Sequence, residues 1–312
     1  MIEMVIDARR KDLGGFDVGR VLPFHTRRMV GPFIFLDQMG PAAFAPGSEA
    51  VNVRPHPHIG LSTLTYLFEG EIMHRDNTGA TQAIRPGEVN WMTAGKGIVH
   101  SERTDPLKQS QGGPMHGMQA WIALPTGSEE VDPSFHHHGE DGQPAYDNQG
   151  LFARLVAGEA YGARAAAPAS SPLFYVHWEL SEGVRTTPPP GRGPGGYSER
   201  ALYVVRGEIQ VGDRTFHEGQ MIVLEPTAEP TVKALRASTV MVMGGEPVGP
   251  RVIWWNFVHS SQERIDQAKA DWKAGRMALP VEDDIEFIPL PDVPSTPEPA
   301  ASGVKPEPTH PV

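Results

Sequence analysis

Four side chains that can bind a metal occur as two closely spaced pairs in the first third of the chain. His56 and His58 flank Pro57, and His100 and Glu102 follow with one residue between them. Side chains at positions i and i+2 of a β-strand point to the same face of the sheet. If each pair lies on a strand and the two strands are neighbours, three imidazoles and one carboxylate meet at one place.

Such a ligand set suits one divalent transition metal per chain. Imidazole and carboxylate groups bind Fe(II), which we place first, and also Mn, Co, Ni, Cu or Zn. Four protein ligands leave one or two positions of an octahedral ion open, as metal catalysis requires. Glu102 is the only carboxylate of the set, so it is also the candidate catalytic base. In the alternative, Glu102 is a base beside the metal and does not bind it.

The residues around both pairs have the pattern of short strands joined by tight turns. The chain has 34 Gly and 31 Pro among 312 residues, which favours turns over long helices. Pro57 lacks an amide donor, which suits the edge of a sheet. The polar segment 128–149 is predicted to be a long connection. Runs of β-branched and aromatic residues predict strands within residues 61–75, 81–84, 89–94 and 118–125.

The same pattern returns in the second half of the chain. TLTYLFEGEI at 63–72 aligns with RALYVVRGEI at 200–209, an offset of 137 residues. A repeat this long is a duplicated domain, so we predict an all-β protein of two β-barrels in tandem. The four candidate ligands align with residues that cannot bind a metal through their side chains, namely Gly193, Gly195, Val232 and Ala234. We therefore expect a metal in the first barrel only.

One helix and one tail are predicted near the C-terminus. Ser260 at the N-cap and Glu263 form a capping box. The residues that then share one helix face are Ile265, Ala268 and Trp272. The Pro-rich stretch 289–312 lacks the apolar side chains that would offset its ordering entropy, so we expect it to be disordered. The expected domains are an N-terminal metal-binding barrel at 1–145, a degenerate barrel with the helix at 146–288, and the tail.

Composition and charge narrow the classes of function. A formal net charge of −11 argues against direct nucleic-acid binding. The chain has no cysteine, so disulfides, thiolate metal sites and a cysteine nucleophile are excluded. It begins without an apolar signal region and has no run near the roughly 18 apolar residues of a membrane span. We therefore expect a cytoplasmic protein without a membrane partner, and a monomer.

Several other residues near these strands have two possible roles each. The tract His136-His137-His138 could bind a metal, but its place in the polar connection favours a solvated loop. His74 could orient a group at the site or form a hydrogen bond within its strand. Gln119 could line the barrel and meet a ligand. Trp91 and Met92 fit core packing as well as substrate contact.

Two stretches around the ligand pairs closely resemble the pirin family of the cupin superfamily. They are HPHIGLSTLTYLFEGEIMHRD and IRPGEVNWMTAGKGIVHSE, in which WMTAG-x-GI-x-H-x-E is specific to that family. The resemblance covers most of residues 1–288. It implies two tandem cupin barrels of the double-stranded β-helix (jelly-roll) type. It also implies one metal in the N-terminal barrel, held by His56, His58, His100 and Glu102.

The resemblance also suggests a function. Several pirins have quercetin 2,3-dioxygenase activity, which implies a metal-dependent dioxygenase that opens the heterocycle of a flavonol or related enolic aromatic with O2. Other pirins are described as regulators, so the alternative is a non-enzymatic regulator that binds a protein partner through the face beside the metal. Many pirins read HPHRGFET where this chain reads HPHIGLST. Ile59 and Ser62 thus replace an Arg and a Glu near the site, which bears on the polarity of the pocket and on the substrate.

Overall fold

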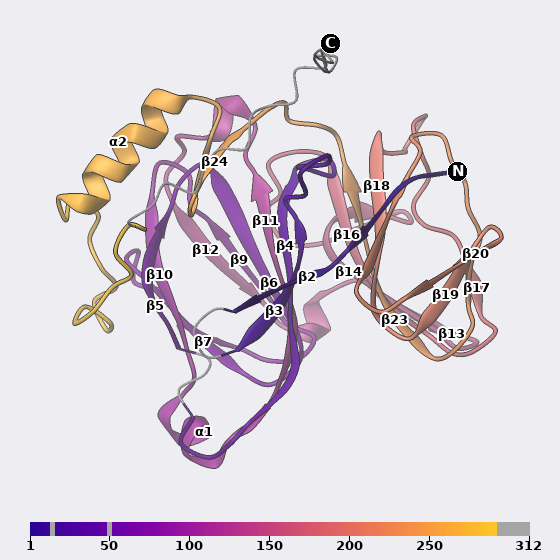
Figure 1. Ribbon diagram of the computed structural model, residues 1–312, viewed down its shortest axis with the longest axis horizontal. Coiled ribbons are helices and arrows are strands. Elements are labelled where there is room, and N and C mark those ends of the chain that lie inside the picture. The colour runs from indigo at the N-terminus through magenta and orange to yellow at the C-terminus, as the bar shows by residue number, and fades with distance from the viewer. Residues whose placement is uncertain (13–15, 49–51, 292–312) are drawn as a thin grey trace, which may run out of the picture.

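The computed structural model describes residues 1–12, 16–48 and 52–291, which form two β-barrels side by side (Figure 1). The N-terminal barrel joins a seven-stranded sheet, in the order β12-β9-β6-β11-β4-β3-β2, to a four-stranded sheet, in the order β5-β10-β7-β8. The strands of the larger sheet are β2 Arg9–Asp12, β3 Asp17–Leu22, β4 Phe33–Phe44, β6 Leu61–Glu69, β9 Val89–Thr93, β11 Gly113–Ala123 and β12 Ser134–His138. Those of the smaller sheet are β5 Asn52–His58, β7 Ile72–Asp76, β8 Thr81–Ile84 and β10 Ile98–Arg103.

The C-terminal barrel repeats this plan with an eight-stranded and a four-stranded sheet. The larger sheet contains β1 Ile2–Asp7, β13 Ala145–Asn148, β14 Leu151–Ala160, β15 Ala163–Arg164, β16 Leu173–Leu180, β18 Glu199–Arg206, β21 Gln220–Leu224 and β23 Ser238–Gly245. The smaller sheet contains β17 Arg185–Thr186, β19 Glu208–Val211, β20 Arg214–His217 and β22 Val232–Ala234. The prediction of an all-β protein with two tandem barrels is confirmed.

The two larger sheets pack against each other and form the core between the barrels. Along β6, Leu64 and Tyr66 point into this core, whereas Leu61 and Leu67 point into the N-terminal barrel, because successive side chains of a strand alternate between faces. The C-terminal barrel contributes residues such as Tyr175, Tyr203, Met221 and Met241. The strands thus have two apolar faces, which explains their nearly continuous apolar runs.

Both ends of the chain cross from one barrel to the other. Strand β1 pairs with β21 in the sheet of the C-terminal barrel. After β23 the chain returns to the N-terminal barrel as the hairpin of β24 Val252–Trp254 and β25 Phe257–His259, followed by helix α2 Gln262–Lys273. In Figure 1, α2 lies at the outer side of the N-terminal barrel, near β24. Its buried face packs with the hairpin and the N-terminal barrel in a cluster that contains Ile59, Val99, Trp254, Phe257, Ile265, Ala268 and Trp272.

Helix α2 has the predicted buried face but begins one residue later than predicted. Ile265, Ala268 and Trp272 are buried as expected. The N-cap is Ser261, whose hydroxyl accepts a hydrogen bond from the amide of Arg264 at 3.3 Å. The prediction of Ser260 was wrong because the hydroxyl of Ser260 instead donates to Glu129, a residue far away in the sequence.

The segment predicted as a long connection between the barrels contains regular structure. Besides the 3-10 helices η1 Thr126–Ser128 and η2 Glu140–Gly142, it holds β12 and β13. The His136-His137-His138 tract lies on β12, where His136 pairs with Trp91 of β9. The prediction of a loop was wrong because an edge of the larger sheet was available to pair with this polar stretch.

A second short helix, α1 Pro106–Gln111, follows β10 and is capped by Asp105.

The predicted tail at 289–312 lies mostly outside the described residues, which end at 291. Within the described part, Leu290 packs against the α2 cluster. None of the helices in the described ranges has the length and apolar character needed to cross a membrane.

Candidate metal centre

The two candidate ligand pairs lie on neighbouring antiparallel strands, as predicted. His56 and His58 are on β5, and His100 is on β10. In the pairing of these strands His100 is directly opposite His56, and Ile98 is opposite His58. Strand β5 is the edge of its sheet. The missing amide hydrogen of Pro57 therefore costs the sheet no backbone hydrogen bond. The four-stranded sheet therefore presents three imidazoles on one face.

The three imidazoles converge tightly. The ring centroids of His56 and His100 lie 4.3 Å apart, and that of His58 lies 5.1 Å from each of them. Their ligand atoms all lie within 4.8 Å of one another. Within the described part of the chain this is the one group of three or more His, Cys, Asp or Glu side chains that could hold a metal ion.

Each ring has a hydrogen-bond partner at Nδ1. His56 Nδ1 lies 2.9 Å from the carbonyl oxygen of Arg54, and His58 Nδ1 lies 3.0 Å from that of Asn256. A carbonyl only accepts, so both rings carry their proton on Nδ1 and have a lone pair on Nε2. A partner of this kind fixes the tautomer of a metal-binding histidine.

The partner of His100 is a second histidine. His100 Nδ1 lies 3.4 Å from His74 Nδ1, and His74 Nε2 lies 2.8 Å from Asp76 Oδ2. Burial would raise the pKa of Asp76, but hydrogen bonds from His74 and Thr78 hold it below its usual value. The ionised Asp76 accepts from His74 Nε2–H, so His74 Nδ1 accepts from His100. Both readings of His74 thus hold, since it bonds within its strand and also orients a ring of the cluster.

The cluster fits a metal. His100 Nε2 is buried and has no hydrogen-bond partner, which is costly for a polar atom unless something else satisfies it. Burial lowers the pKa of His56 to about 4 and holds the pKa values of His58 and His100 well below the usual 6.5. All three rings are therefore neutral at pH 7, the form that binds a cation.

Glu102 lies two residues beyond His100 on β10 but outside the three-histidine group. It pairs with His74 on β7 and with Val53 on β5, where the register shifts between His100 and Glu102. Burial raises the pKa of Glu102 to about 7. Its role as a fourth ligand stays a prediction, and its raised pKa suits proton transfer near neutral pH.

One aromatic side chain packs against the cluster, and a hydrogen-bonded polar pair lies on strands β6 and β11 of the same barrel. Trp121 lies edge-on to His58, with ring centroids 5.0 Å apart, and stacks on Phe35 at 4.1 Å. Thr65 donates to Gln119 at 2.8 Å. Gln119 thus has a partner within the barrel, on a strand that also carries Trp121 towards the histidines.

Other residues singled out in the sequence are placed differently. Trp91 belongs to the core between the barrels, whereas Met92 packs inside the N-terminal barrel near Trp121. Ile59 packs against the α2 cluster, and the hydroxyl of Ser62 lies 3.1 Å from that of Thr93. Ile59 and Ser62 therefore do not join the apolar cluster that contains Trp121.

The His136-His137-His138 tract and a surface cavity lie apart from the three histidines. His137 Nδ1 bonds to Asn90 at 2.8 Å, while the rings of His136 and His138 are parallel at 6.4 Å. A cavity of about 390 Å³ opens at the end of the barrel near α1. Residues that line it include Phe44, Glu71, Arg85, Thr104, Lys108 and Met115.

Two contributions to the site were not found from the sequence. The Asn256 carbonyl comes from a hairpin 198 residues after His58, and no side-chain motif marks a backbone acceptor. The Asp76–His74 pair had a visible signal, because His74 and Asp76 are spaced i, i+2 on a strand like the ligands themselves.

Comparison with known proteins places the chain in a family. The Pirin domain model matches residues 15–122, and the model of the Pirin C-terminal cupin domain matches residues 175–278. A pirin-like protein of Caulobacter vibrioides is 63% identical over 294 residues, which are 94% of this chain and all of that protein.

Two further similarities concern proteins named for an activity. A Pseudomonas aeruginosa protein that carries a provisional quercetin 2,3-dioxygenase name is 36% identical over 275 residues, 86% of this chain and 83% of that protein. The crystal structure of a quercetin 2,3-dioxygenase from Acinetobacter baumannii superimposes with a TM-score of 0.83 at 30% identity, covering 94% of this chain and 96% of that one. With its two cupin barrels and its histidine cluster in the first of them, the chain belongs to the pirin family.

Proposed function

We propose that this protein is a metal-dependent dioxygenase of the quercetinase type, which opens the heterocycle of a flavonol or a related enolic aromatic. The observation that carries the proposal is the convergence of three neutral imidazoles with their Nε2 atoms free. His56, His58 and His100 would hold one divalent metal, with Glu102 as the fourth ligand and Fe(II) as the first candidate. The bound metal would acidify the enolic hydroxyl and supply the redox chemistry that O2 requires.

Glu102 is the candidate catalytic base for the enolic proton. In the protein without metal, burial raises the pKa of Glu102 to about 7, and a general base works best when its pKa is near the working pH. The partners of Glu102 across the sheet are His74 and Val53. We propose that this carboxylate, two residues beyond His100 on β10, accepts the enolic proton.

The side of the cluster nearest Trp121 suits an aromatic substrate. Trp121 lies edge-on to His58 and stacks on Phe35, and ring-to-ring contacts of this kind stabilise aromatic ligands beyond their buried area. The proteins named as quercetin 2,3-dioxygenases support the same substrate class. We assign the chemistry to the domain at 1–145, and a structural role to the domain at 146–288 except for its hairpin β24–β25, which returns to the N-terminal barrel.

The test is aerobic turnover of a panel of flavonols by protein loaded with Fe(II), with elemental analysis of the same sample. We expect one metal per chain, consumption of O2 and loss of flavonol absorbance. Chains loaded with Mn, Co, Ni, Cu or Zn identify the active ion. A fully loaded protein that turns over no enolic aromatic would refute the dioxygenase assignment and leave the metal centre intact.

A second candidate function is regulation through a protein partner. Beside β10 the C-terminal segment exposes Val281 and Ile285, which are 82% and 96% exposed, and Asp283 anchors it to Arg103, the neighbour of Glu102. Contiguous exposed apolar patches often mark contact surfaces, and we propose that Val281 and Ile285 belong to one beside β10. In this case we expect partner binding to depend on metal and to be lost in a Val281→Ser/Ile285→Ser double variant.

A further inference from the structure

The hairpin β24–β25 is the element that supplies the acceptor for His58. Its two-residue turn is Trp255-Asn256, with Trp255 at φ +52°, a conformation that bulky residues rarely adopt. The turn directs the Asn256 carbonyl to His58 Nδ1 at 3.0 Å. The adjoining backbone approaches so closely that a Cβ on Gly60 would lie 1.9 Å from the Val258 oxygen.

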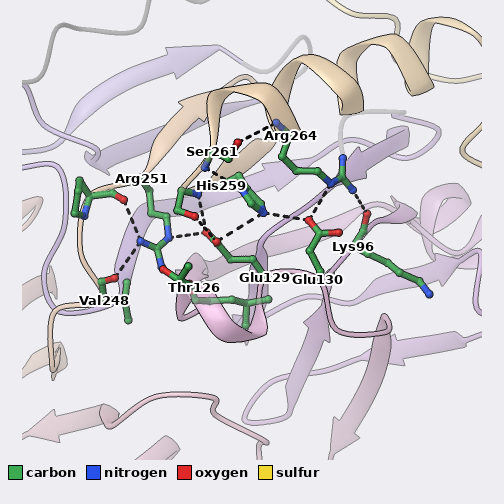
Figure 2. A network of polar contacts seen from close by, with 12 residues as sticks. Lys96, Thr126, Glu129, Glu130, Val248, Arg251, His259, Ser261 and Arg264 are labelled. Carbon is green, nitrogen blue, oxygen red and sulfur yellow. Dashed lines mark hydrogen bonds and ion pairs between the residues drawn. The ribbon is translucent and has the colours of Figure 1, made fainter.

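A single buried carboxylate holds both ends of this hairpin. Glu129 Oε1 lies 2.9 Å from the Nε of Arg251, the residue before β24. It also accepts from the backbone amide of Ser260, the residue after β25, at 2.7 Å, and Glu129 Oε2 accepts from the Ser260 hydroxyl at 2.5 Å. Both side chains of the ion pair are 1% exposed. Figure 2 shows Arg251 and His259 on either side of the Glu129 carboxylate.

Neighbouring contacts extend this clamp from the hairpin to helix α2. Glu130 Oε1 lies 3.1 Å from His259 Nε2 and accepts from Arg264 Nε at 2.8 Å. Arg251 also donates to the carbonyl of Leu124 at 2.7 Å. The segment after β11 of the N-terminal barrel thus holds the hairpin at both of its ends, through Arg251 before β24 and through His259 and Ser260 at the end of β25 (Figure 2).

From these contacts we infer that Glu129 is a positioning residue for the metal centre, acting through the hairpin on His58. By fixing residues 251 and 260, Glu129 keeps the Asn256 carbonyl against His58 Nδ1, which sets the tautomer and ring orientation of this ligand. His56 does not depend on the clamp, because its acceptor, the Arg54 carbonyl, is on the same strand. The inference rests on the proposed metal centre, and it does not depend on the dioxygenase reaction.

The test compares Glu129→Ala with a matched variant in the other barrel. Glu246 accepts from the backbone amide and hydroxyl of Ser198 at 2.8 and 2.7 Å, the same motif as Glu129 with Ser260, so Glu246→Ala is the control. In metal-free protein labelled with ¹⁵N-histidine, we expect Glu129→Ala to change the Nδ1–H tautomer of His58 and leave that of His56 unchanged. Ni(II) affinity should fall about 10- to 100-fold, as for a lost supporting contact.

Two further variants separate positioning from general stability. Glu129→Gln keeps an oxygen for Ser260 and should restore part of the affinity. A glycine inserted between Trp255 and Asn256 leaves the clamp intact but displaces the carbonyl, so it should reproduce the loss. An unchanged His58 signal and Ni(II) affinity in the insertion variant, or equal losses in Glu129→Ala and Glu246→Ala, would overturn the inference alone. A wild-type chain that binds no Ni(II), Co(II) or Fe(II) would overturn the metal centre and the inference with it.

Discussion

The two barrels share the same arrangement of strands, but the interior of the first is partly polar and that of the second is apolar. In the first barrel Thr65 pairs with Gln119. At the equivalent place in the second barrel Leu202 pairs with Val242. The repeat likewise matches His74 with Val211, and the ligands on β10 with residues of β22. All of these C-terminal residues belong to one apolar cluster, which includes Leu202, Val211, Val232, Ala234 and Val242.

The difference shows what a buried polar site demands of its surroundings. In the second barrel apolar side chains fill the interior, and nearly all of them need no hydrogen-bond partner. In the first, each buried polar group requires one, and His58, His100 and Thr65 find theirs in Asn256, His74 and Gln119. An unpaired buried polar group costs about 1–3 kcal/mol, so the candidate metal centre depends on contacts that the second barrel does not need.

Removal of two ligands should have the largest effect on this comparison. The double variant His56→Ala/His100→Ala removes the pair that faces across β5 and β10. We expect Ni(II) affinity to fall by more than about 100-fold, beyond the loss caused by supporting contacts, as measured by competition with a chelator. The matched variant Thr186→Ala/Val232→Ala alters a facing pair in the second barrel and should keep one metal per chain. Two metals per wild-type chain, or metal retained by the histidine variant, would contradict the assignment.

Replacement of the carboxylate should separate ligand from base. Glu102→Gln keeps the size and one oxygen donor but cannot accept a proton at neutral pH. We expect metal binding about 10- to 100-fold weaker and, at saturating metal, turnover at least about 100-fold slower, from steady-state flavonol assays. If added metal restores the full rate, Glu102 is not the base, although the histidine site would stand.

A polar residue in the second interior should be poorly tolerated. Leu202→Thr places a hydroxyl where every neighbour in the cluster is apolar. We expect a loss of about 2–4 kcal/mol in unfolding free energy, from lost apolar contacts and an unpaired hydroxyl, measured by urea denaturation. The matched change Thr65→Val removes one hydrogen bond to Gln119 and should cost about 1 kcal/mol. Equal losses would show that the two interiors respond alike.

The smallest expected effect is the release of one proton on metal binding. At about pH 6 the raised pKa of Glu102, about 7, keeps this carboxyl mostly protonated, whereas the lowered pKa of His56, about 4, keeps its ring neutral. If Glu102 is a ligand, a metal displaces about one proton, and Glu102→Gln should displace almost none. Calorimetry in buffers of different ionisation enthalpy measures this number.

The calorimetry must be done at a pH at which the protein stays folded. Because burial lowers the pKa values of the three histidines, their neutral forms support the folded state fully above pH 6.5. This contribution is lost as the pH falls towards 4, since the unfolded chain binds those protons first. Equal proton release by the wild type and Glu102→Gln would exclude Glu102 as a ligand.

The sequence was sufficient for features that depend on local periodicity. The alternation of strands predicted that His56 and His58 share a face, and the spacing of Ile265, Ala268 and Trp272 predicted the buried side of α2. The repeat predicted a second barrel without ligands. Its residue matches were less accurate, since the residue opposite Val232 is Thr186 on β17 and not Gly193, because the loop before β18 is longer than its counterpart.

Only the tertiary structure decided which distant groups complete the site. Asn256, Glu129 and the pairing of β1 with β21 join residues more than 100 positions apart, and no local pattern encodes such contacts. Ser260 illustrates the reason. The position of Ser260 in the sequence suits an N-cap. Its hydroxyl instead donates to the buried carboxylate of Glu129, because hydrogen bonds to a charged group are stronger than those to a neutral one. The sequence thus determined the candidate ligand pairs by itself, whereas the orientation of His58 depends on the hairpin that folds back onto the first barrel.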